Sequence, residues 1–126
     1  MASAPAITTV LAAALLFGAA ASSAQADAGA NLFAQQCAAC HAVAVDAPRG
    51  LGPNLRGIVG KAAGAAAGFP YSADFKKELG EQTWTPALLD AWLTDPQDIA
   101  PGNYMMYKQA DGEVRKAIIA YLQTVQ

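Results

Sequence analysis

Histidine and cysteine are scarce in this chain of 126 residues, which has one histidine and two cysteines. A closed structural zinc site takes four ligands, so these three residues could form one only if a carboxylate joined them. Basic residues are also few: eight Lys and Arg stand against ten Asp and Glu, a formal charge of −2. No basic stripe is present to neutralise phosphates, which argues against nucleic acid as a partner and against strong binding to an anionic membrane.

Strand patterns, internal repeats and a second domain are also missing, so the sequence predicts an all-α fold. The expected helices run from Ala28 to His41, from Ser72 to Lys77, from Thr85-Pro86 to Asp95-Pro96, and from Asp111 onward. Ser72 and Thr85 are predicted N-caps, and Gly80 is a predicted helix stop. The last helix carries an amphipathic stripe of Val114, Ile118, Tyr121, Leu122 and Val125. Residues 42–69 are rich in Gly and Pro and predict a long loop, which a compact domain accommodates when a ligand organises it.

The first 26 residues contain no charged side chain. An apolar stretch from Ile7 to Ala21 leads to Ala24-Gln25-Ala26, a pattern typical of a signal-peptide cleavage site. The stretch is short for a membrane span, which needs about 20 residues, although the missing Lys and Arg would also fit an uncleaved anchor. We predict a cleaved signal peptide over residues 1–26 and one domain over residues 27–126. So small a core is marginal unless another group adds to it.

The two cysteines and the histidine stand together as Cys37-Ala38-Ala39-Cys40-His41. Cys-x-x-Cys-His is the pattern of covalent haem attachment. The two thiols can bond to one porphyrin edge, and the imidazole can ligate the iron. Two alternatives remain open, a thiol–disulfide pair and part of a zinc site. The first usually lies beside a strand–helix–strand pattern, which this sequence lacks, and the second needs a fourth ligand.

A six-coordinate haem would need a second ligand opposite His41. The soft donors beyond residue 26 are Met105 and Met106, which follow the turn-forming Pro101-Gly102. Methionine often only fills gaps in a core, but this pair lies outside the periodic segments. A thioether ligand raises the reduction potential relative to two histidines. Two occupied axial positions would leave no open site for oxygen or peroxide, which favours electron transfer over an enzyme such as a peroxidase.

In order and spacing, these residues resemble the class I c-type cytochromes, of the bacterial kind that is close to mitochondrial cytochrome c. The resemblance covers nearly all of residues 27–126. It implies one covalently bound haem c, attached through Cys37 and Cys40, in a crevice closed by irregular loops. It also implies the cytochrome c fold, in which the N- and C-terminal helices cross, here with Gly29 and Phe33 against Ile118 and Tyr121.

The resemblance further implies roles for single residues. Gly52-Pro53-Asn54-Leu55 matches a segment whose proline carbonyl accepts a hydrogen bond from the ligand histidine. Phe69-Pro70-Tyr71-Ser72 and Thr83-Trp84 match segments whose tyrosine and tryptophan bond a haem propionate. The segment from Pro101 to Met105 matches Pro-Gly-Thr-Lys-Met, which selects Met105 as the iron ligand over Met106. The implied set is His41 and Met105 on the iron, with cofactor contacts from Pro53, Tyr71, Trp84, Trp92 and Asn103.

The resemblance implies a monomeric electron carrier of the bacterial periplasm, not an enzyme, that meets a redox donor and a redox acceptor in brief encounters. The alternative is a dedicated electron-accepting subunit of one periplasmic dehydrogenase. Mitochondrial relatives ring the exposed haem edge with lysines, whereas Gln35 and Gln36 precede the haem motif here. This difference predicts weaker steering toward acidic partners. Lys61 stands where relatives often carry an arginine, and Lys76, Lys77 and Lys108 are the candidate docking lysines.

Overall fold

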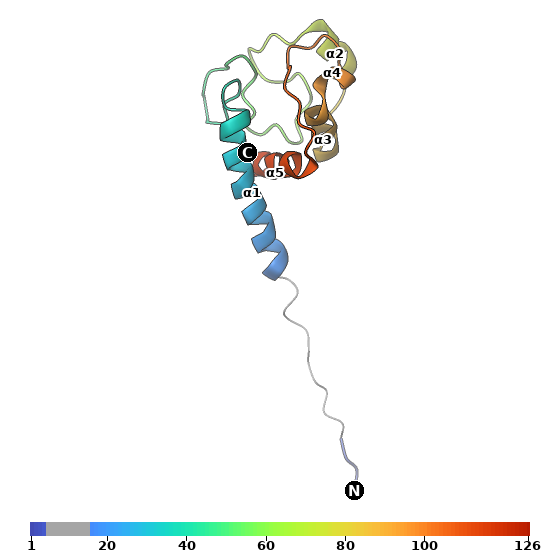
Figure 1. The fold of residues 1–126 in the computed structure, drawn as a ribbon. Helices are drawn as coiled ribbons and strands as arrows, with labels where there is room; N and C mark the ends of the chain where they lie inside the picture. The colour runs from blue at the N-terminus through green and yellow to red at the C-terminus, as the bar shows by residue number, and fades with distance from the viewer. Residues whose placement is uncertain (5–15) are drawn as a thin grey trace.

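A computed structural model describes residues 1–4 and 16–126, with side chains described for residues 1–4 and 22–126. Its helices are α1 (Leu16–Gln36), α2 (Ala73–Leu79), α3 (Pro86–Thr94), α4 (Pro96–Ile99) and α5 (Gly112–Thr124) (Figure 1). Within the described residues there is no strand, and a single isolated bridge pairs Ala62 with Thr83. The all-α prediction is confirmed. The stretch between α1 and α2 is irregular, as its Gly and Pro content predicts.

Helices α1 and α5 cross each other and hold the two ends of the domain together (Figure 1). Gly29 makes this possible, because a Cβ atom at that position would collide with the carbonyl oxygen of Ala117 and lie 2.9 Å from the Cβ of Tyr121. Next to the crossing, the rings of Phe33 and Tyr121 lie 5.4 Å apart at 54°. Ile118 is buried in the same core, so the predicted crossing of the first and last helices is confirmed.

Three helices begin where the sequence predicts. Ser72 Oγ accepts from the amide of Phe75 at 3.0 Å, and Thr85 Oγ1 accepts from the amide of Leu88 at 3.1 Å. Asp111 caps α5 in the same way. These side chains satisfy amides that lack partners in the first turn of a helix. Helix α2 ends at Leu79, two residues later than expected, and Gly80 keeps a right-handed conformation with φ −60°.

The first helix ends earlier than predicted. It stops at Gln36, and residues 37–40 form a turn. The amides of Cys37 and Ala38 both bond to the carbonyl of Phe33, at 2.8 and 3.0 Å, which breaks the regular i to i−4 ladder. The amides of Cys40 and His41 then close on the carbonyl of Cys37 at 3.0 and 2.9 Å. The haem motif therefore lies in a tight turn at the end of α1, not in its last helical turn.

Helix α4 is a second departure, because no helix was predicted there. Asp95 Oδ1 accepts from the amide of Gln97 at 3.0 Å, and Pro96 occupies the first helical position. Asp95-Pro96 is the same kind of helix start as Thr85-Pro86, but the helix that begins here has only four residues. Such a short helix has no hydrophobic repeat for a sequence pattern to detect.

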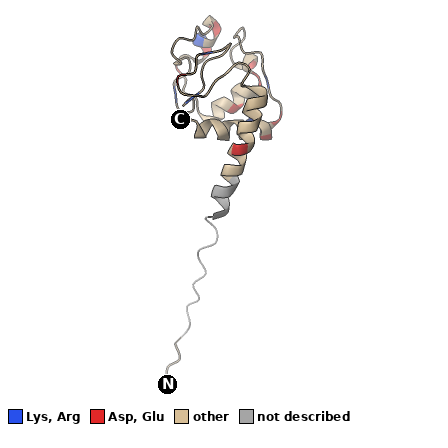
Figure 2. Cartoon of the chain, turned by 90° about the vertical axis from the view of Figure 1, so that its left-hand side faces the viewer, with Lys and Arg blue, Asp and Glu red and all other residues tan. Residues whose placement is uncertain are grey.

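The N-terminal prediction falls largely outside the described side chains. Helix α1 runs without a break through Ala24-Gln25-Ala26, and Asp27 is its one charged residue (Figure 2). The apolar stretch from Ile7 to Ala21 lies outside the residues whose side chains are described. Cleavage after residue 26 stays a prediction. None of the helices formed by the described residues has the length and apolarity that a membrane-spanning helix needs.

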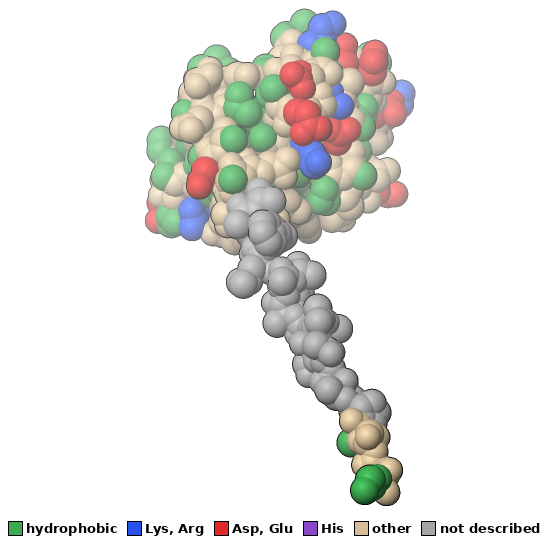
Figure 3. All heavy atoms as spheres, turned by 60° about the horizontal axis from the view of Figure 1, so that its bottom comes forward, with side chains coloured by type: hydrophobic (Ala, Val, Ile, Leu, Met, Phe, Trp, Pro, Cys, Tyr) green, Lys and Arg blue, Asp and Glu red, His purple; other side chains and the backbone are tan. Residues whose placement is uncertain are grey.

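Charged side chains lie on the outside of the domain, and on the face drawn in Figure 3 acidic groups gather with basic groups among them. One ion pair joins two helices: Arg115 Nε of α5 lies 2.8 Å from Asp90 Oδ1 of α3. The same guanidinium donates from Nη1 to the carbonyls of Gln109 and Ala110 at 2.9 Å. Because Arg115 is largely covered, this cluster holds the chain that enters α5 more firmly than an exposed ion pair would.

Candidate functional site

One cavity of about 550 Å³ lies at the centre of the domain. Its volume falls in the range of roughly 300–1,000 Å³ that is usual for ligand sites. All nine residues that the sequence predicts for the site line it: Cys37, Cys40, His41, Pro53, Tyr71, Trp84, Trp92, Asn103 and Met105. They come from six separate segments of the chain, and the fold brings them together.

The wall of the cavity is apolar and aromatic. Tyr71 stacks on Phe75 with ring centroids 4.7 Å apart, and Phe75 meets Trp92 edge to face at 5.5 Å. Trp84 meets Trp92 in the same manner at 5.6 Å. No Asp, Glu, Lys or Arg is among the residues that line the cavity. A flat apolar ligand could therefore bind without burying an unpaired protein charge.

His41 is held in one orientation and one tautomer. Its Nδ1 lies 2.8 Å from the carbonyl oxygen of Pro53. Because a carbonyl only accepts, Nδ1 carries the hydrogen, and the lone pair stays on Nε2. Gly52 lies against the ring: a Cβ atom there would strike the imidazole, with Nδ1 only 2.7 Å away. Burial lowers the pKa of His41, against the opposing effect of the Pro53 hydrogen bond, so the ring is held in its neutral, metal-binding form.

The two cysteines are half-buried, and neither forms a disulfide. Burial, together with the nearby Cys40, raises the pKa of Cys37 to about 11. At neutral pH Cys37 is therefore a thiol, and the thiolate that attacks in disulfide exchange is scarce at this residue. Within the part of the chain that the structure describes, no three His, Cys, Asp or Glu side chains gather as a metal site. These observations count against both alternatives left open by the sequence.

Met105 is half-buried, and its sulfur has a defined partner. Trp92 Nε1 donates to Met105 Sδ at 3.2 Å, which fixes the sulfur while leaving its second lone pair free. Met106 also borders the cavity but is 78% exposed, and its sulfur lies 3.6 Å from Nε2 of Gln97. Of the two methionines, Met105 is the one held inside the domain.

The loop that carries Met105 is shaped by two amide side chains. Asn103 is buried, and its Nδ2 donates to the carbonyls of Pro96 and Ala100 at 3.0 and 2.8 Å. Its Oδ1 accepts from the amide of Met105 at 2.7 Å. Gln97 Nε2 donates to the carbonyls of Asn103 and Met105 at 3.0 and 3.1 Å. Sequence reasoning missed Gln97, and the only available signal was the helix start at Asp95-Pro96.

Tyr71 and Trp84 also line the cavity. The Tyr71 hydroxyl accepts from the amide of Ala66 at 3.3 Å, and burial raises its pKa, so it keeps a proton to donate. The backbone of Trp84 forms two hydrogen bonds of 2.8 Å. Its amide donates to the carbonyl of Lys61, and its carbonyl accepts from the amide of Gly60. Lys61 itself is exposed and points Nζ to the carbonyl of Arg56 at 3.2 Å. Bonds from Tyr71 and Trp84 to a cofactor stay predictions.

The donor set fits a haem. Two free thiols, a neutral imidazole with Nε2 available, and a thioether with a free lone pair all border one apolar space. These are the groups that tether a c-type haem and supply its two axial ligands.

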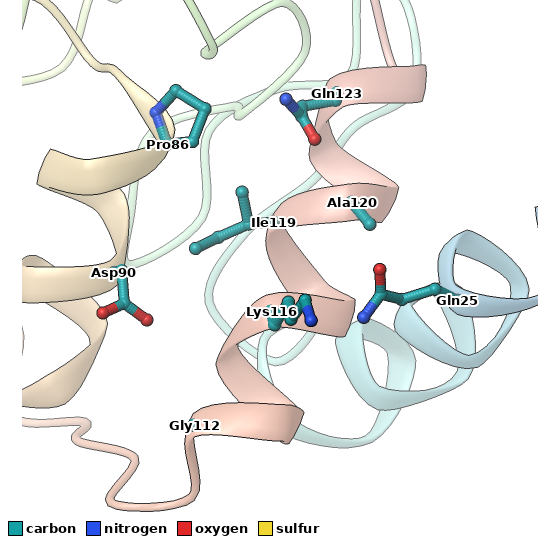
Figure 4. Close-up of a pocket in the computed structure, with 8 residues that line it drawn as sticks. All are labelled: Gln25, Pro86, Asp90, Gly112, Lys116, Ile119, Ala120 and Gln123. Carbon is teal, nitrogen blue, oxygen red and sulfur yellow. The ribbon is translucent and has the colours of Figure 1, made fainter. Parts of the chain in front are cut away.

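A second hollow, of about 370 Å³, lies between α3 and α5. Figure 4 shows Pro86 and Asp90 on one wall, Lys116 and Gln123 on the other, and Ile119 reaching between the two helices. None of the predicted site residues borders it. It has no group of donors aimed at a common point, and we assign it no chemistry.

The chain is similar to known proteins over most of its length. The family model described as Cytochrome c matches residues 26–126. Cytochrome c2 of Rhodoblastus acidophilus is 41% identical over 97 residues, covering 76% of this chain and 88% of that protein. Cytochrome c-550 of Ancylobacter novellus is 38% identical over 98 residues, covering 76% and 91%.

One relative is longer than this chain. The c-type cytochrome cy of Rhodobacter capsulatus is 37% identical over 101 residues, which span 79% of this chain but only 49% of that protein. Among solved structures, cytochrome c2 from Rhodospirillum centenum superposes with a TM-score of 0.73 at 33% identity. The match covers 80% of this chain and 98% of that one, so the fold is shared almost throughout that protein.

Proposed function

This chain belongs to the cytochrome c family, and we propose that it carries single electrons in the bacterial periplasm on one haem with His41 and Met105 as axial ligands. The family binds one haem c covalently, and Cys37 and Cys40 are present to attach it. Its cytochrome c2 relatives are electron carriers rather than enzymes. One observation carries the proposal: nine residues from six segments of the chain line a single cavity without formal charge.

When bound, haem iron gains or loses one electron without making or breaking a substrate bond. The residues of this chain do the rest. Pro53 keeps the lone pair of His41 on Nε2, and Trp92 holds the sulfur of Met105 in place. Both ligands are neutral, and the wall around them is apolar and aromatic. Held by both His41 and Met105, a bound haem would offer small molecules no open site and would change its oxidation state with little rearrangement.

The N-terminal segment supports the proposed location. An apolar stretch followed by Ala24-Gln25-Ala26 fits export. Donor and acceptor would meet the protein briefly and at a small interface, as redox partners usually do.

The test is to express the full chain in a host that can mature c-type cytochromes. We expect a red protein whose mass equals the chain from Asp27 plus one haem. Met105→Ala should abolish the methionine-to-iron charge-transfer band of the oxidised protein and lower its midpoint potential. Met106→Ala, the matched control, should leave both unchanged. A colourless protein, or equal effects of the two substitutions, would contradict the proposal.

A further inference from the structure

Met106 combines an exposed sulfur with a place on the loop that carries Met105. Its side chain is 78% exposed, and it borders the same cavity as Met105, its neighbour in the chain. Its sulfur lies 3.6 Å from Nε2 of Gln97, a long contact to a weak acceptor. Oxidation of such a thioether to a sulfoxide turns an apolar side chain into a polar one.

Gln97 holds the Met105 loop with a single amide group. Its Oε1 accepts from the amide of Gly102 at 3.0 Å, which fixes the way the amide group faces. Its Nε2 donates to the carbonyls of Asn103 and Met105 at 3.0 and 3.1 Å and also faces the sulfur of Met106. An amide nitrogen has only two hydrogens, so three acceptors compete for two bonds. The two carbonyls keep the short bonds because a thioether is the weakest of the three acceptors.

An oxygen atom on the Met106 sulfur would change the outcome of this competition. We propose that Met106 is a site of sulfoxidation by hydrogen peroxide, and that its oxidation loosens the Met105 loop through Gln97. A sulfoxide oxygen is a much stronger acceptor than a thioether, so one Nε2 hydrogen turns to it. The carbonyl of Asn103 or of Met105 then loses its bond. This inference rests on the proposed function, because the loosened loop matters only if Met105 ligates iron.

The oxidation transfers one oxygen atom and two electrons. A lone pair of the Met106 sulfur attacks one oxygen of the peroxide, the S–O bond forms and the O–O bond breaks. The sulfur loses two electrons and the peroxide gains them. The other oxygen leaves as hydroxide and takes the proton of the transferred oxygen, so the products are the sulfoxide and water.

Met105 is protected from the same reaction. Its sulfur accepts from Trp92 Nε1 at 3.2 Å, and the proposed bond to iron would use its second lone pair. No lone pair is then left to attack a peroxide. The third methionine of the chain, Met1, belongs to the segment that is predicted to be removed. Among residues 27–126, Met106 is therefore the methionine that peroxide should oxidise first.

The test measures how fast Met105 leaves the iron before and after oxidation. The holoprotein is treated with limiting hydrogen peroxide, and the product with one added oxygen is isolated and mapped by peptide mass spectrometry, which should place the oxygen on Met106. Imidazole added to the oxidised-iron form of each protein binds only after Met105 dissociates. We expect binding to be about fivefold faster after Met106 oxidation, the effect of one lost hydrogen bond of ordinary strength. Methionine sulfoxide reductases with a thiol reductant should restore the original rate.

Three variants separate this route from other damage by peroxide. Met106→Leu keeps the size of the side chain but cannot take up oxygen, so the same treatment should leave its imidazole rate unchanged. Met106→Gln offers an amide oxygen to Gln97 and should speed binding with no oxidant present. Gln97→Ala should bind imidazole fast from the start, and oxidation of Met106 should then add less than about twofold, because the two residues no longer interact.

Three results would overturn the inference. One is a first oxygen found on Met105 instead of Met106. Another is a protein fully oxidised at Met106 that binds imidazole at the original rate. The third is an equal acceleration by oxidation in the wild type and in Gln97→Ala. Failure of the proposed function would look different: the untreated protein would lack the methionine-to-iron charge-transfer band, or would bind imidazole without waiting for a protein ligand to leave.

Discussion

The hydroxyl of Tyr107 donates a 2.7 Å hydrogen bond to Oε1 of Gln36, a residue 71 positions earlier in the chain. Gln36 is the last residue of α1 and directly precedes the first cysteine, while Tyr107 follows the Met105 loop. Gln109 Nε2 donates to the same oxygen at 3.0 Å, and the amide of Gln109 bonds to the carbonyl of Leu93 at 2.8 Å. These bonds tie the loop that carries the proposed sulfur ligand to the end of the haem motif.

Replacing Tyr107 by Phe removes one of the two donors to Gln36 and keeps the ring. We expect the free energy of unfolding to fall by about 1 kcal/mol, the usual net contribution of such a bond. The Met105 loop should loosen first, so the charge-transfer band should disappear at a lower denaturant concentration than the helical signal. Tyr104→Phe is the control, because the side chain of Tyr104 is 67% exposed. The same loss of band stability in both variants would show that the Gln36 bond does not hold the loop.

The same tyrosine predicts how stability depends on pH. Burial raises the pKa of Tyr107 above its ordinary value of 10 in the folded protein. The unfolded chain therefore loses this proton first, and the folded state binds more protons above pH 10. By linkage, the free energy of unfolding falls as pH rises from 10 through the folded-state pKa. Tyr107→Phe should remove that part of the fall, and the difference between the two unfolding curves against pH isolates it from Tyr71, whose pKa is also raised.

Trp92→Phe tests the bond between the indole and the sulfur. The N–H of Trp92 draws electron density from Met105 Sδ at 3.2 Å, which weakens the sulfur as a donor to oxidised iron. Without this bond we expect a better donor, a lower midpoint potential and a shifted charge-transfer band. Leu93→Ala is the control, since it opens a comparable space in the cavity wall and leaves the bond in place. A potential that falls equally in both variants would assign the effect to packing instead.

Local chemistry explains why the sequence predicted so much of this fold. Caps such as Ser72 and Thr85 act over three residues, so they can be predicted from a short segment. The α1–α5 crossing leaves no room for a Cβ atom at one position, and a glycine there is visible in the sequence. The end of α1 was predicted too late because it depends on two amides that share the carbonyl of Phe33. The contacts of Gln97 could not be predicted, because no sequence pattern indicates which carbonyls the side chain of a glutamine will bind.

The residues of the site also fall into a group that the sequence predicts and a group that it does not. The residues that supply the chemistry follow a motif with fixed spacing, and all nine line one cavity. The residues that hold them, such as Gln36 and Tyr107, are joined across long stretches of chain and have no spacing to detect. Their roles become visible only when the fold brings them together.

Gly52→Ala tests the fit of His41 against its loop. The added methyl would strike the imidazole, so the ring or the loop must shift, and overpacking of this kind costs about 1–3 kcal/mol. We expect a lower unfolding midpoint and a change in the potential, because the His41–Pro53 bond of 2.8 Å cannot keep its geometry. Gly112→Ala at the start of α5 meets no atom closer than 3.4 Å and should leave the potential unchanged. A normal potential in Gly52→Ala would show that the loop accommodates the methyl freely.

The cavity itself predicts what happens without haem. Without haem, the apolar and aromatic side chains around the space of about 550 Å³ would face water instead of a buried partner. So small a domain has little core of its own to offset that loss, since the whole stability of a typical domain is only about 5–15 kcal/mol. A double variant with Cys37→Ser and Cys40→Ser, purified without haem, should therefore lack the far-ultraviolet helical signal and unfold without a cooperative transition. A colourless variant that melts cooperatively with native helix content would mean that the α1–α5 crossing and the caps suffice to fold the chain. The core would then form without the haem.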